Sequence, residues 1–162
     1  MTSDIKYYGD PAKTQAYIDI MHTMSIYQLG IDNADFEQVG RAFAVDATLQ
    51  LSNGTRVSGC AKICDAFRQR LENRLKNVDR ASVFQRHNLT TRFIEVTGPD
   101  AAHSVSYFTV FSEIGLDHVG RYLDRFALSE EGRWLIASRE IHLEWMHETS
   151  RFRANKSQIA YS

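Results

Sequence analysis

The chain has 162 residues and a nearly balanced charge, with 19 lysines and arginines against 20 aspartates and glutamates. This length favours a single domain over residues 1–162, and the absence of a basic run argues against nucleic acid as a partner. The N-terminus has no signal-peptide pattern and no window is apolar enough to span a bilayer, so we expect no membrane partner and a cytoplasmic location.

Metal and cofactor chemistry find no support in the sequence. Cys60 and Cys64 are four residues apart in a helical pattern, without a histidine or third cysteine placed to complete a metal site. We expect them to be small buried thiols of a reduced protein. Glycine-rich phosphate loops and nucleophile elbows are also missing. The sequence therefore predicts no metal site and no cofactor.

Helical periodicity dominates the N-terminal third. Apolar side chains recur there at three- and four-residue steps: Tyr17, Ile20, Met21, Met24, Tyr27 and Ile31. This spacing predicts an amphipathic helix that begins at Thr14 or at the Asp10-Pro11 pair. A short second helix is predicted around Phe36, Val39 and Phe43, capped by Asn33 or Asp35. Asp32 then lies at the corner between two helices.

The remaining elements follow in a clear order. Residues 47–51 alternate as a strand, 52–54 form a turn and 55–57 a short return strand. A third helix after Gly59 carries Ile63, Phe67, Leu71 and Leu75. The period then changes to two in four strand-like segments at 82–97, 102–114, 118–129 and 133–146, separated by turns at 98–100, 115–117 and 129–132. The tail from Glu148 onward is predicted to be polar and loosely held.

Helices first and strands last, with a hairpin between the second and third helices, indicate an α+β fold. We expect three helices from the N-terminal half to pack on one face of a curved antiparallel or mixed sheet. Long strands twist and curl, so a sheet of this kind capped by helices is expected to enclose a cone-shaped cavity.

Three stretches of the sequence resemble a known family. Residues 31–36 at the helix corner, 85–88 in a strand and 120–136 near the end, taken with the order of elements, resemble the SnoaL-like branch of the nuclear transport factor cone fold, a cystatin-like roll. The likeness covers about residues 12–146. Within that branch the pattern is most similar to scytalone dehydratase and hexachlorocyclohexane dehydrochlorinase.

The resemblance implies a catalytic pair. Both enzymes use a strand histidine and an aspartate at the end of the first helix, and the matching positions here are His87 and Asp32. The tyrosines, second histidine and Ser/Asn pair that surround the substrate of scytalone dehydratase are not matched. Ile31 precedes Asp32, and the strand with Tyr107 has no histidine at the matching position. The resemblance therefore implies the base machinery without naming the substrate.

An aspartate and a histidine held together can act without a cofactor. Asp32 would accept a proton from one ring nitrogen of His87, fix the tautomer and leave the other nitrogen to abstract a proton. Each residue considered alone has a structural alternative, since aspartates often cap helices and strand histidines are often structural. The leading hypothesis is a lyase that performs a dehydratase-type β-elimination on a small apolar, aromatic or polyketide-like molecule.

Four further residues are candidates for substrate binding: Tyr27, Asn53, Phe67 and Tyr107. Tyr27 lies about one helical turn before Asp32, and Asn53 lies in the turn after the first strand. For the three aromatic residues, a place in the core is the competing interpretation. The other histidines are not predicted to act in the chemistry, and His142 is the first that we would examine again. They are His22, His103, His118, His142 and His147.

Large apolar side chains on the predicted outer sheet face favour self-association. Phe108, Val110, Tyr122 and Phe126 would be costly in water, so we expect a homo-oligomer, and the resemblance favours a trimer over a dimer. Two alternative functions stay open. One is an isomerase or cyclase of the same fold. The other is a non-catalytic ligand-binding protein or a structural subunit like the β subunit of ring-hydroxylating dioxygenases, in which phenylalanines would fill the cone.

Overall fold

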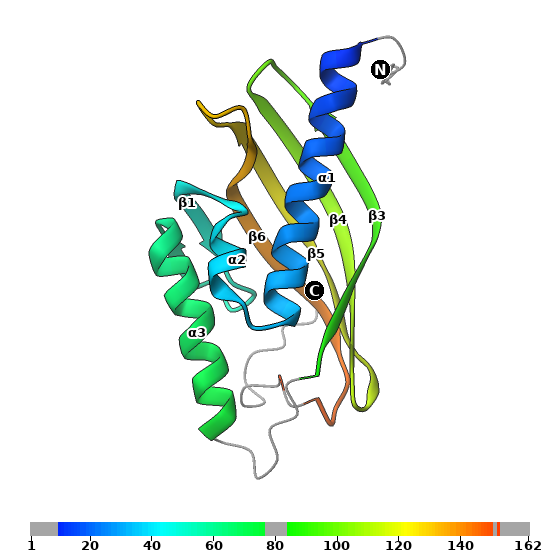
Figure 1. Cartoon of the computed structure of the whole chain (residues 1–162). Coiled ribbons are helices and arrows are strands. Elements are labelled where there is room, and N and C mark those ends of the chain that lie inside the picture. The colour runs from blue at the N-terminus through cyan, green and yellow to red at the C-terminus, as the bar shows by residue number, and fades with distance from the viewer. Residues whose placement is uncertain (1–9, 77–83, 151, 153–162) are drawn as a thin grey trace.

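The computed structural model describes residues 10–76, 84–150 and 152, which form three helices and a six-stranded sheet (Figure 1). The helices are α1 (Pro11–Asp32), α2 (Phe36–Gly40) and α3 (Cys60–Lys76). The strands are β1 (Phe43–Gln50), β2 (Arg56–Ser58), β3 (Arg86–Val96), β4 (Ala101–Ser112), β5 (Gly115–Leu128) and β6 (Trp134–Met146).

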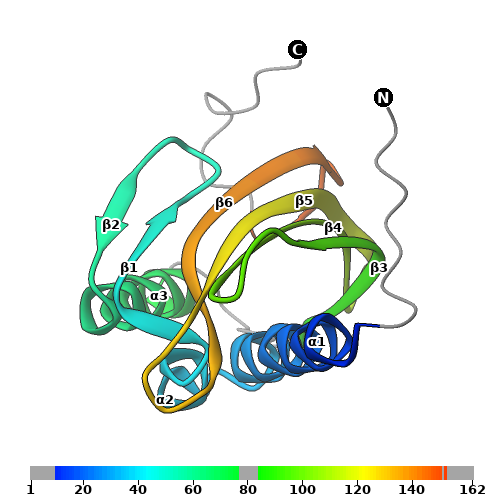
Figure 2. The ribbon, with the colours of Figure 1, turned by 90° about the horizontal axis from the view of Figure 1, so that it is seen from above.

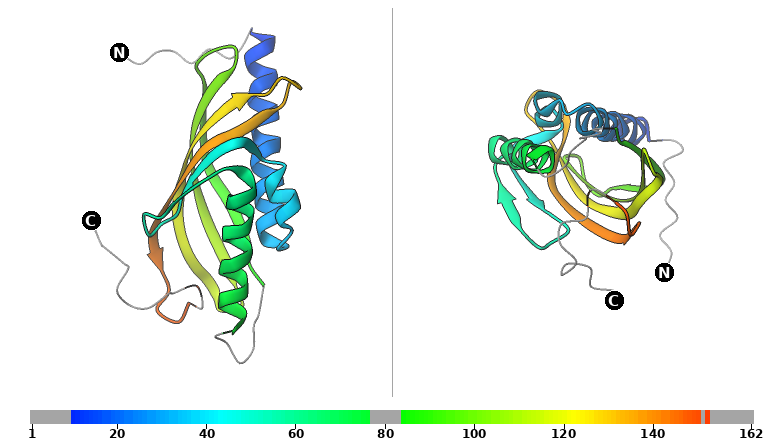
Figure 3. Two further views of the ribbon diagram at one scale, coloured as in Figure 1. Left: turned by 90° about the vertical axis from the view of Figure 1, so that its left-hand side faces the viewer. Right: turned by 90° about the horizontal axis from the view of Figure 1, so that it is seen from below.

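The sheet is mixed and curved. Its strand order is β2-β1-β6-β5-β4-β3, with every pair antiparallel except β1 and β6. The four long strands arch over α1 (Figure 2), and the three helices lie on one side of the sheet (Figure 3). The predicted α+β class and curved mixed sheet are confirmed. Among the described residues, no helix is long and apolar enough to cross a membrane.

Helix α1 anchors the core. It begins at the predicted Asp10-Pro11 pair, where Asp10 Oδ1 accepts hydrogen bonds from the backbone N–H groups of Ala12 and Lys13 at 3.1 and 3.2 Å. Ile20 and Met24 on its inner face are fully buried. Each contributes about 1.5–3 kcal/mol through the apolar area that it removes from water.

A tight corner joins α1 to α2. Asp35 caps α2 by accepting from Gln38 N–H at 2.9 Å, and Ala34 adopts a left-handed φ of 55°. Phe43 lies in β1, so its predicted place in the second helix is wrong. The backbone N–H of Ile136 donates to Ala42 O at 2.9 Å, and this pairing with β6 overrides the helical spacing.

The start of β5 differs from the sequence prediction. The strand begins at Gly115, so the predicted turn at 115–117 is wrong, and Asp117 lies within the sheet. Val110 pairs with His118 and Phe111 pairs with Leu116, which leaves Asp117 as the extra residue of a β-bulge. A bulge redirects a side chain, and here it turns the Asp117 carboxylate inward, where its residue is 1% exposed.

The predicted assignment of sheet faces is also wrong. Phe108, Val110, Tyr122 and Phe126 are buried on the helix-covered face. The outward face carries a different apolar set, exposed by 38–45%: Phe93, Tyr107, Phe111, Leu116 and Trp145. Both faces of these strands carry large apolar side chains, so alternation alone cannot distinguish inside from outside.

We propose that this outward face supports a homo-oligomer, with three copies favoured over two. Covering the five exposed side chains with a second copy would remove their cost in water. Sedimentation velocity at micromolar concentration should show the oligomer, and a double substitution of Tyr107 and Phe111 by serine should shift it toward the monomer. A wild-type protein that sediments as a monomer would contradict the proposal.

Candidate active site

Asp32 and His87 meet between the end of α1 and the start of β3. His87 Nδ1 lies 2.6 Å from Asp32 Oδ1, and the backbone N–H of His87 donates to both carboxylate oxygens at 3.2 and 3.1 Å. The predicted contact is therefore present. Because an ionised carboxylate only accepts, Nδ1 carries the proton and Nε2 is left as the acceptor. The two side chains are only 9% and 7% exposed, which keeps water from competing for the bond.

The neighbouring residues hold this contact in place. Gln85 Nε2 donates to the carbonyl of Ile31 at 2.8 Å and so satisfies a carbonyl at the end of α1. A carboxylate at a helix C-terminus is disfavoured by the helix dipole, by about 0.3–1 kcal/mol. The Asp32 oxygens therefore do not cap the helix; they accept hydrogen bonds from His87 on the sheet.

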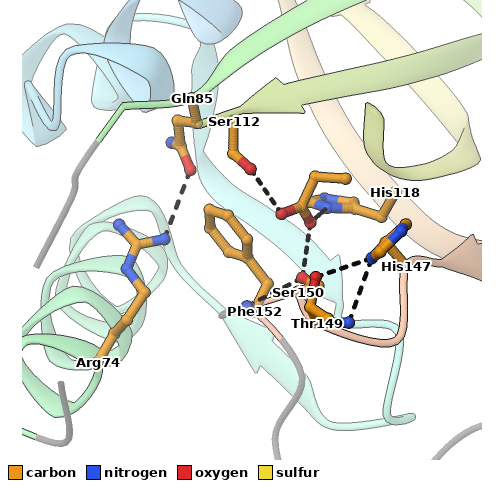
Figure 4. A network of polar contacts seen from close by, with 9 residues as sticks. Arg74, Gln85, Ser112, His118, His147, Thr149, Ser150 and Phe152 are labelled. Carbon is orange, nitrogen blue, oxygen red and sulfur yellow. Dashed lines mark hydrogen bonds and ion pairs between the residues drawn. The ribbon is translucent and has the colours of Figure 1, made fainter. Parts of the chain in front are cut away.

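A second aspartate–histidine pair lies beside the first, and Figure 4 shows its His118 with the residues around it. His118 Nδ1 is 2.6 Å from Asp117 Oδ1, and the His118 and His87 ring centroids are 6.3 Å apart with perpendicular planes. Asp117 also accepts from Ser112 Oγ at 2.8 Å and from Ser150 Oγ at 2.6 Å. The carboxylate again fixes the Nδ1–H tautomer and leaves Nε2 as an acceptor. The structure thus holds two imidazoles in the same orientation relative to their carboxylates.

Burial and hydrogen bonding set the charges of this second pair. Burial alone would raise the pKa of Asp117, but hydrogen bonds from Ser150, His118 and Ser112, with the charge of His118, together lower it. Burial lowers the pKa of His118, the bond and charge of Asp117 oppose this, and the charge of His87 lowers it further. A positive charge on His87 therefore disfavours a proton on His118.

Aromatic rings surround the two histidines. The Phe108 ring centroid lies 6.2 Å from that of His87 and 6.1 Å from that of His118. Gly120 makes room for Phe108, because a Cβ at that position would lie 2.6 Å from the Phe108 ring and 2.1 Å from a backbone carbonyl of β6. Phe152 covers His118 from the other side at 5.1 Å.

The end of the described chain is fastened to this site. Ser150 is buried against Asp117, and the Phe152 backbone N–H donates to Ser150 Oγ at 3.1 Å. The prediction of a loosely held tail is therefore wrong for Ser150 and Phe152, since buried polar groups need partners and Asp117 supplies one. The rest of the tail, 151 and 153–162, lies outside the described residues.

Tyr27 is a core residue. Its ring is 2% exposed, stacks on the Arg139 guanidinium at 4.0 Å and meets the edge of Tyr122 at a centroid distance of 6.0 Å. Arg139 in turn makes a bidentate ion pair with Asp124, at 2.7 Å for both bonds. Burial raises the pKa of the Tyr27 phenol, and Arg139 partly opposes that rise. No described contact joins Tyr27 to the His87 ring, and the competing interpretation of a core aromatic fits better.

The other three predicted binding residues lie apart from the histidines. Phe67 packs at 6.1 Å against Tyr27, and Asn53 is exposed, its Oδ1 accepting from Thr55 N–H within the turn. Tyr107 is 44% exposed on the outward face, one residue from the inward-facing Phe108. The prediction that Tyr107 lines the same site as His87 is therefore wrong, because successive strand residues point to opposite faces.

Among the remaining histidines, His118 is the one that the structure places beside the Asp32–His87 pair, and sequence reasoning missed it. His103 pairs with Glu95 at 3.1 Å, His142 lies 3.5 Å from Glu140, and His147 bonds Thr149 in the turn after β6. None of these three contacts involves the two carboxylate–imidazole pairs. The sequence signal for His118 is its alternation with Gly120 and Tyr122: residues two apart on a strand face the same side, and those two are buried on β5.

The lowered pKa of His118 predicts a loss of stability in mild acid. Between its folded pKa and the ordinary value near 6.5, the unfolded state binds a proton that the folded state does not, so unfolding becomes easier as pH falls. His118→Gln cannot take up this proton. Urea unfolding at pH 7.5 and 5.5 should therefore show a larger loss for wild type than for His118→Gln. His22→Gln, exposed on α1, is the matched control and should follow wild type; equal losses in wild type and His118→Gln would contradict this.

Comparisons with known proteins agree with this fold. Hexachlorocyclohexane dehydrochlorinase LinA-type3 from Novosphingobium barchaimii LL02 is 13% identical, with a TM-score of 0.72 over 85% of this chain and 92% of that chain. A Novosphingobium aromaticivorans protein with the provisional name scytalone dehydratase is 15% identical, with a TM-score of 0.69 over 85% and 89%. A cystatin-like protein of unknown function from Nostoc punctiforme is 21% identical, with a TM-score of 0.65 over 83% and 92%.

These structural likenesses show a shared fold. A search of curated proteins found no significant match. The family assignment rests on the sequence itself, because residues 12–140 match the model of the SnoaL-like domain. That match spans most of the chain and confirms the resemblance seen in the sequence: the protein belongs to the SnoaL-like domain family.

Proposed function

We propose that the protein is a cofactor-independent lyase that performs a dehydratase-type β-elimination with His87 as the base. The observation that carries the proposal is the 2.6 Å contact between His87 Nδ1 and Asp32, since it directs a neutral Nε2 away from the carboxylate. The fold shared with a dehydrochlorinase and with a protein provisionally named scytalone dehydratase supports the same class of reaction.

The proposed step moves one proton and one electron pair. His87 Nε2 takes the proton from a carbon next to an activating carbonyl, the C–H electrons form a carbon–carbon double bond, and the leaving group departs with its own electron pair. Asp32 and the C-terminal end of α1 stabilise the imidazolium that forms. Water as the leaving group takes its proton from a protonated imidazole, so the reaction needs no external acid.

His118 is suited to a complementary role. It lies beside His87 with its own carboxylate, and the charge of His87 lowers the pKa of His118. A neutral His118 can accept a hydrogen bond from the substrate at Nε2, while the proton that leaves with the departing group comes from the His87 imidazolium. Phe108 and Phe152 beside these rings favour a flat, mostly apolar substrate, aromatic or polyketide-like.

Two alternatives are distinguishable by experiment. An isomerase or cyclase of the same fold would return the proton to another carbon and release no group, so its product would have the mass of its substrate. A non-catalytic member would need no base. The pairing of both histidines with buried carboxylates favours an enzyme, because such pairs hold a tautomer that a packing role does not require.

Substitution of the first pair tests the proposal. With a panel of β-hydroxy and β-halo ketones, followed by the absorbance of the conjugated product, His87→Ala should abolish turnover. Asp32→Asn should lower the rate about 10²-fold or more, because the ring loses its charge partner and fixed tautomer. The wild-type rate should fall in mild acid, where imidazoles take up protons.

Thermal unfolding of the same variants separates chemistry from folding. His103→Ala, an exposed strand histidine paired with Glu95, is the matched control and should keep full activity. A folded His87→Ala protein that turns over the same substrate at the wild-type rate would refute the mechanism.

A further inference from the structure

Helix α3 directs a stripe of side chains toward the site. Phe67, Arg70 and Arg74 follow one another at helical steps of three and four residues. Phe67 packs on Tyr27, and the charge of Arg70 acts on the Tyr27 phenol. Arg74 reaches Gln85, which lies just before the strand that carries His87. Arg74 is therefore the member of this stripe that approaches the catalytic pairs.

The Arg74 guanidinium has unusual surroundings for a cation. Its Cζ lies 4.4 Å from the centre of the Phe152 ring, and Nη1 is 3.5 Å from the neutral amide oxygen of Gln85, a long contact (Figure 4). Its Nε is buried and has no hydrogen-bond partner among the described residues. Within the described part of the chain, no carboxylate forms an ion pair with Arg74, although Arg68 on the same helix pairs with Asp65.

A half-buried cation without an anion is costly. Burial lowers the pKa of Arg74, and the more distant charges of Glu113 and Asp117 only partly oppose that effect. Buried charges in proteins are normally paired, and a guanidinium pairs best with a carboxylate through its edge, where two parallel N–H groups point. The Phe152 ring packs against the guanidinium and Gln85 lies near Nη1 alone, so the described residues leave other N–H groups of Arg74 without an acceptor.

Arg74 lies near the proposed base, His87. Gln85 immediately precedes β3 and His87 is the second residue of that strand, and both side chains bond to the end of α1. Residues two apart in an extended chain are separated by about 7 Å. A group held beside Gln85 by Arg74 is therefore about the length of a small organic molecule from the ring of His87.

We propose that Arg74 binds a carboxylate of the substrate, so that the lyase acts on a small organic acid whose reacting carbon lies near His87. This inference rests on the proposed function for its substrate, and it narrows that function from an apolar molecule to one with an anionic end. The carboxylate serves as a handle for binding, and a separate carbonyl activates the proton that His87 removes. Arg74 contacts the substrate, and the Phe152 ring packs against its guanidinium.

Binding of matched acids and amides tests the proposal without turnover. The probes are benzoate, phenylacetate, cinnamate and 1-naphthoate, each beside its neutral amide, titrated into the full-length protein. The readout is the nitrogen and carbon shifts of the His87 and His118 imidazoles by NMR. At least one carboxylate should bind saturably, and its amide should bind about tenfold or more weakly, as the loss of a charged hydrogen-bonded pair implies.

Variants then locate the charge. Arg74→Gln should weaken carboxylate binding about tenfold or more and leave amide binding unchanged, whereas Arg74→Lys should recover part of the loss. Arg68→Gln, an exposed position on the same helix, is the control and should bind as wild type does. If no acid binds saturably, or if acids bind equally to wild type and Arg74→Gln, the proposal is wrong.

The same titration separates this inference from the lyase mechanism. His87→Ala should still bind the acid, read from the His118 signal, because Arg74 rather than His87 holds the carboxylate. A His87→Ala protein that binds acids but retains turnover would refute the lyase mechanism and support the carboxylate site at Arg74. A His87→Ala protein that loses turnover but binds acids and amides equally would support the lyase mechanism and refute the carboxylate site.

Discussion

The Asp32 carboxylate is the interaction on which this site depends. It accepts from both the backbone and the ring of His87, so it fixes where β3 begins relative to the end of α1 and which ring nitrogen is available. A second bond joins the same two segments: Gln85, just before β3, donates to the carbonyl of Ile31, the residue before Asp32. The contacts that join α1 to β3 are therefore the same ones that orient the His87 ring. The hydrogen bonds from His87 also offset the unfavourable interaction of the Asp32 carboxylate with the dipole of α1.

The core beneath the site is polar at its centre. Arg139 and Asp124 form a fully buried bidentate pair between the rings of Tyr27 and Tyr122. Such a pair adds little net stability, yet removal of either partner would leave an unpaired buried charge and cost about 3–5 kcal/mol. It also explains why Tyr27 belongs to the core. The stacked rings of Tyr122 and Phe108, 4.5 Å apart, continue from this ion pair toward the two histidines.

The sequence predicts the elements better than their faces. Helical spacing around Tyr27 and the Asp10-Pro11 start predicts α1 correctly, and the resemblance pairs Asp32 with His87. Alternation could not assign Tyr107 and Phe108 to their faces, because both sides of β4 carry large apolar residues. The bulge at Asp117 is set by the register between β4 and β5, a long-range property that no local pattern contains. For this reason Asp117 and His118 were placed in or beside a turn and their pairing was missed.

We propose that Asp32 holds the His87 ring with its proton on Nδ1 and its acceptor at Nε2. Nitrogen NMR of the imidazoles at neutral pH measures this tautomer directly, with His103 as a reference far from Asp32 in the sequence. This contact predicts a single Nδ1–H tautomer for His87 in wild type and a mixture of tautomers in Asp32→Asn. A wild-type His87 ring protonated on Nε2 would contradict it, since that nitrogen could not then accept a proton from a substrate.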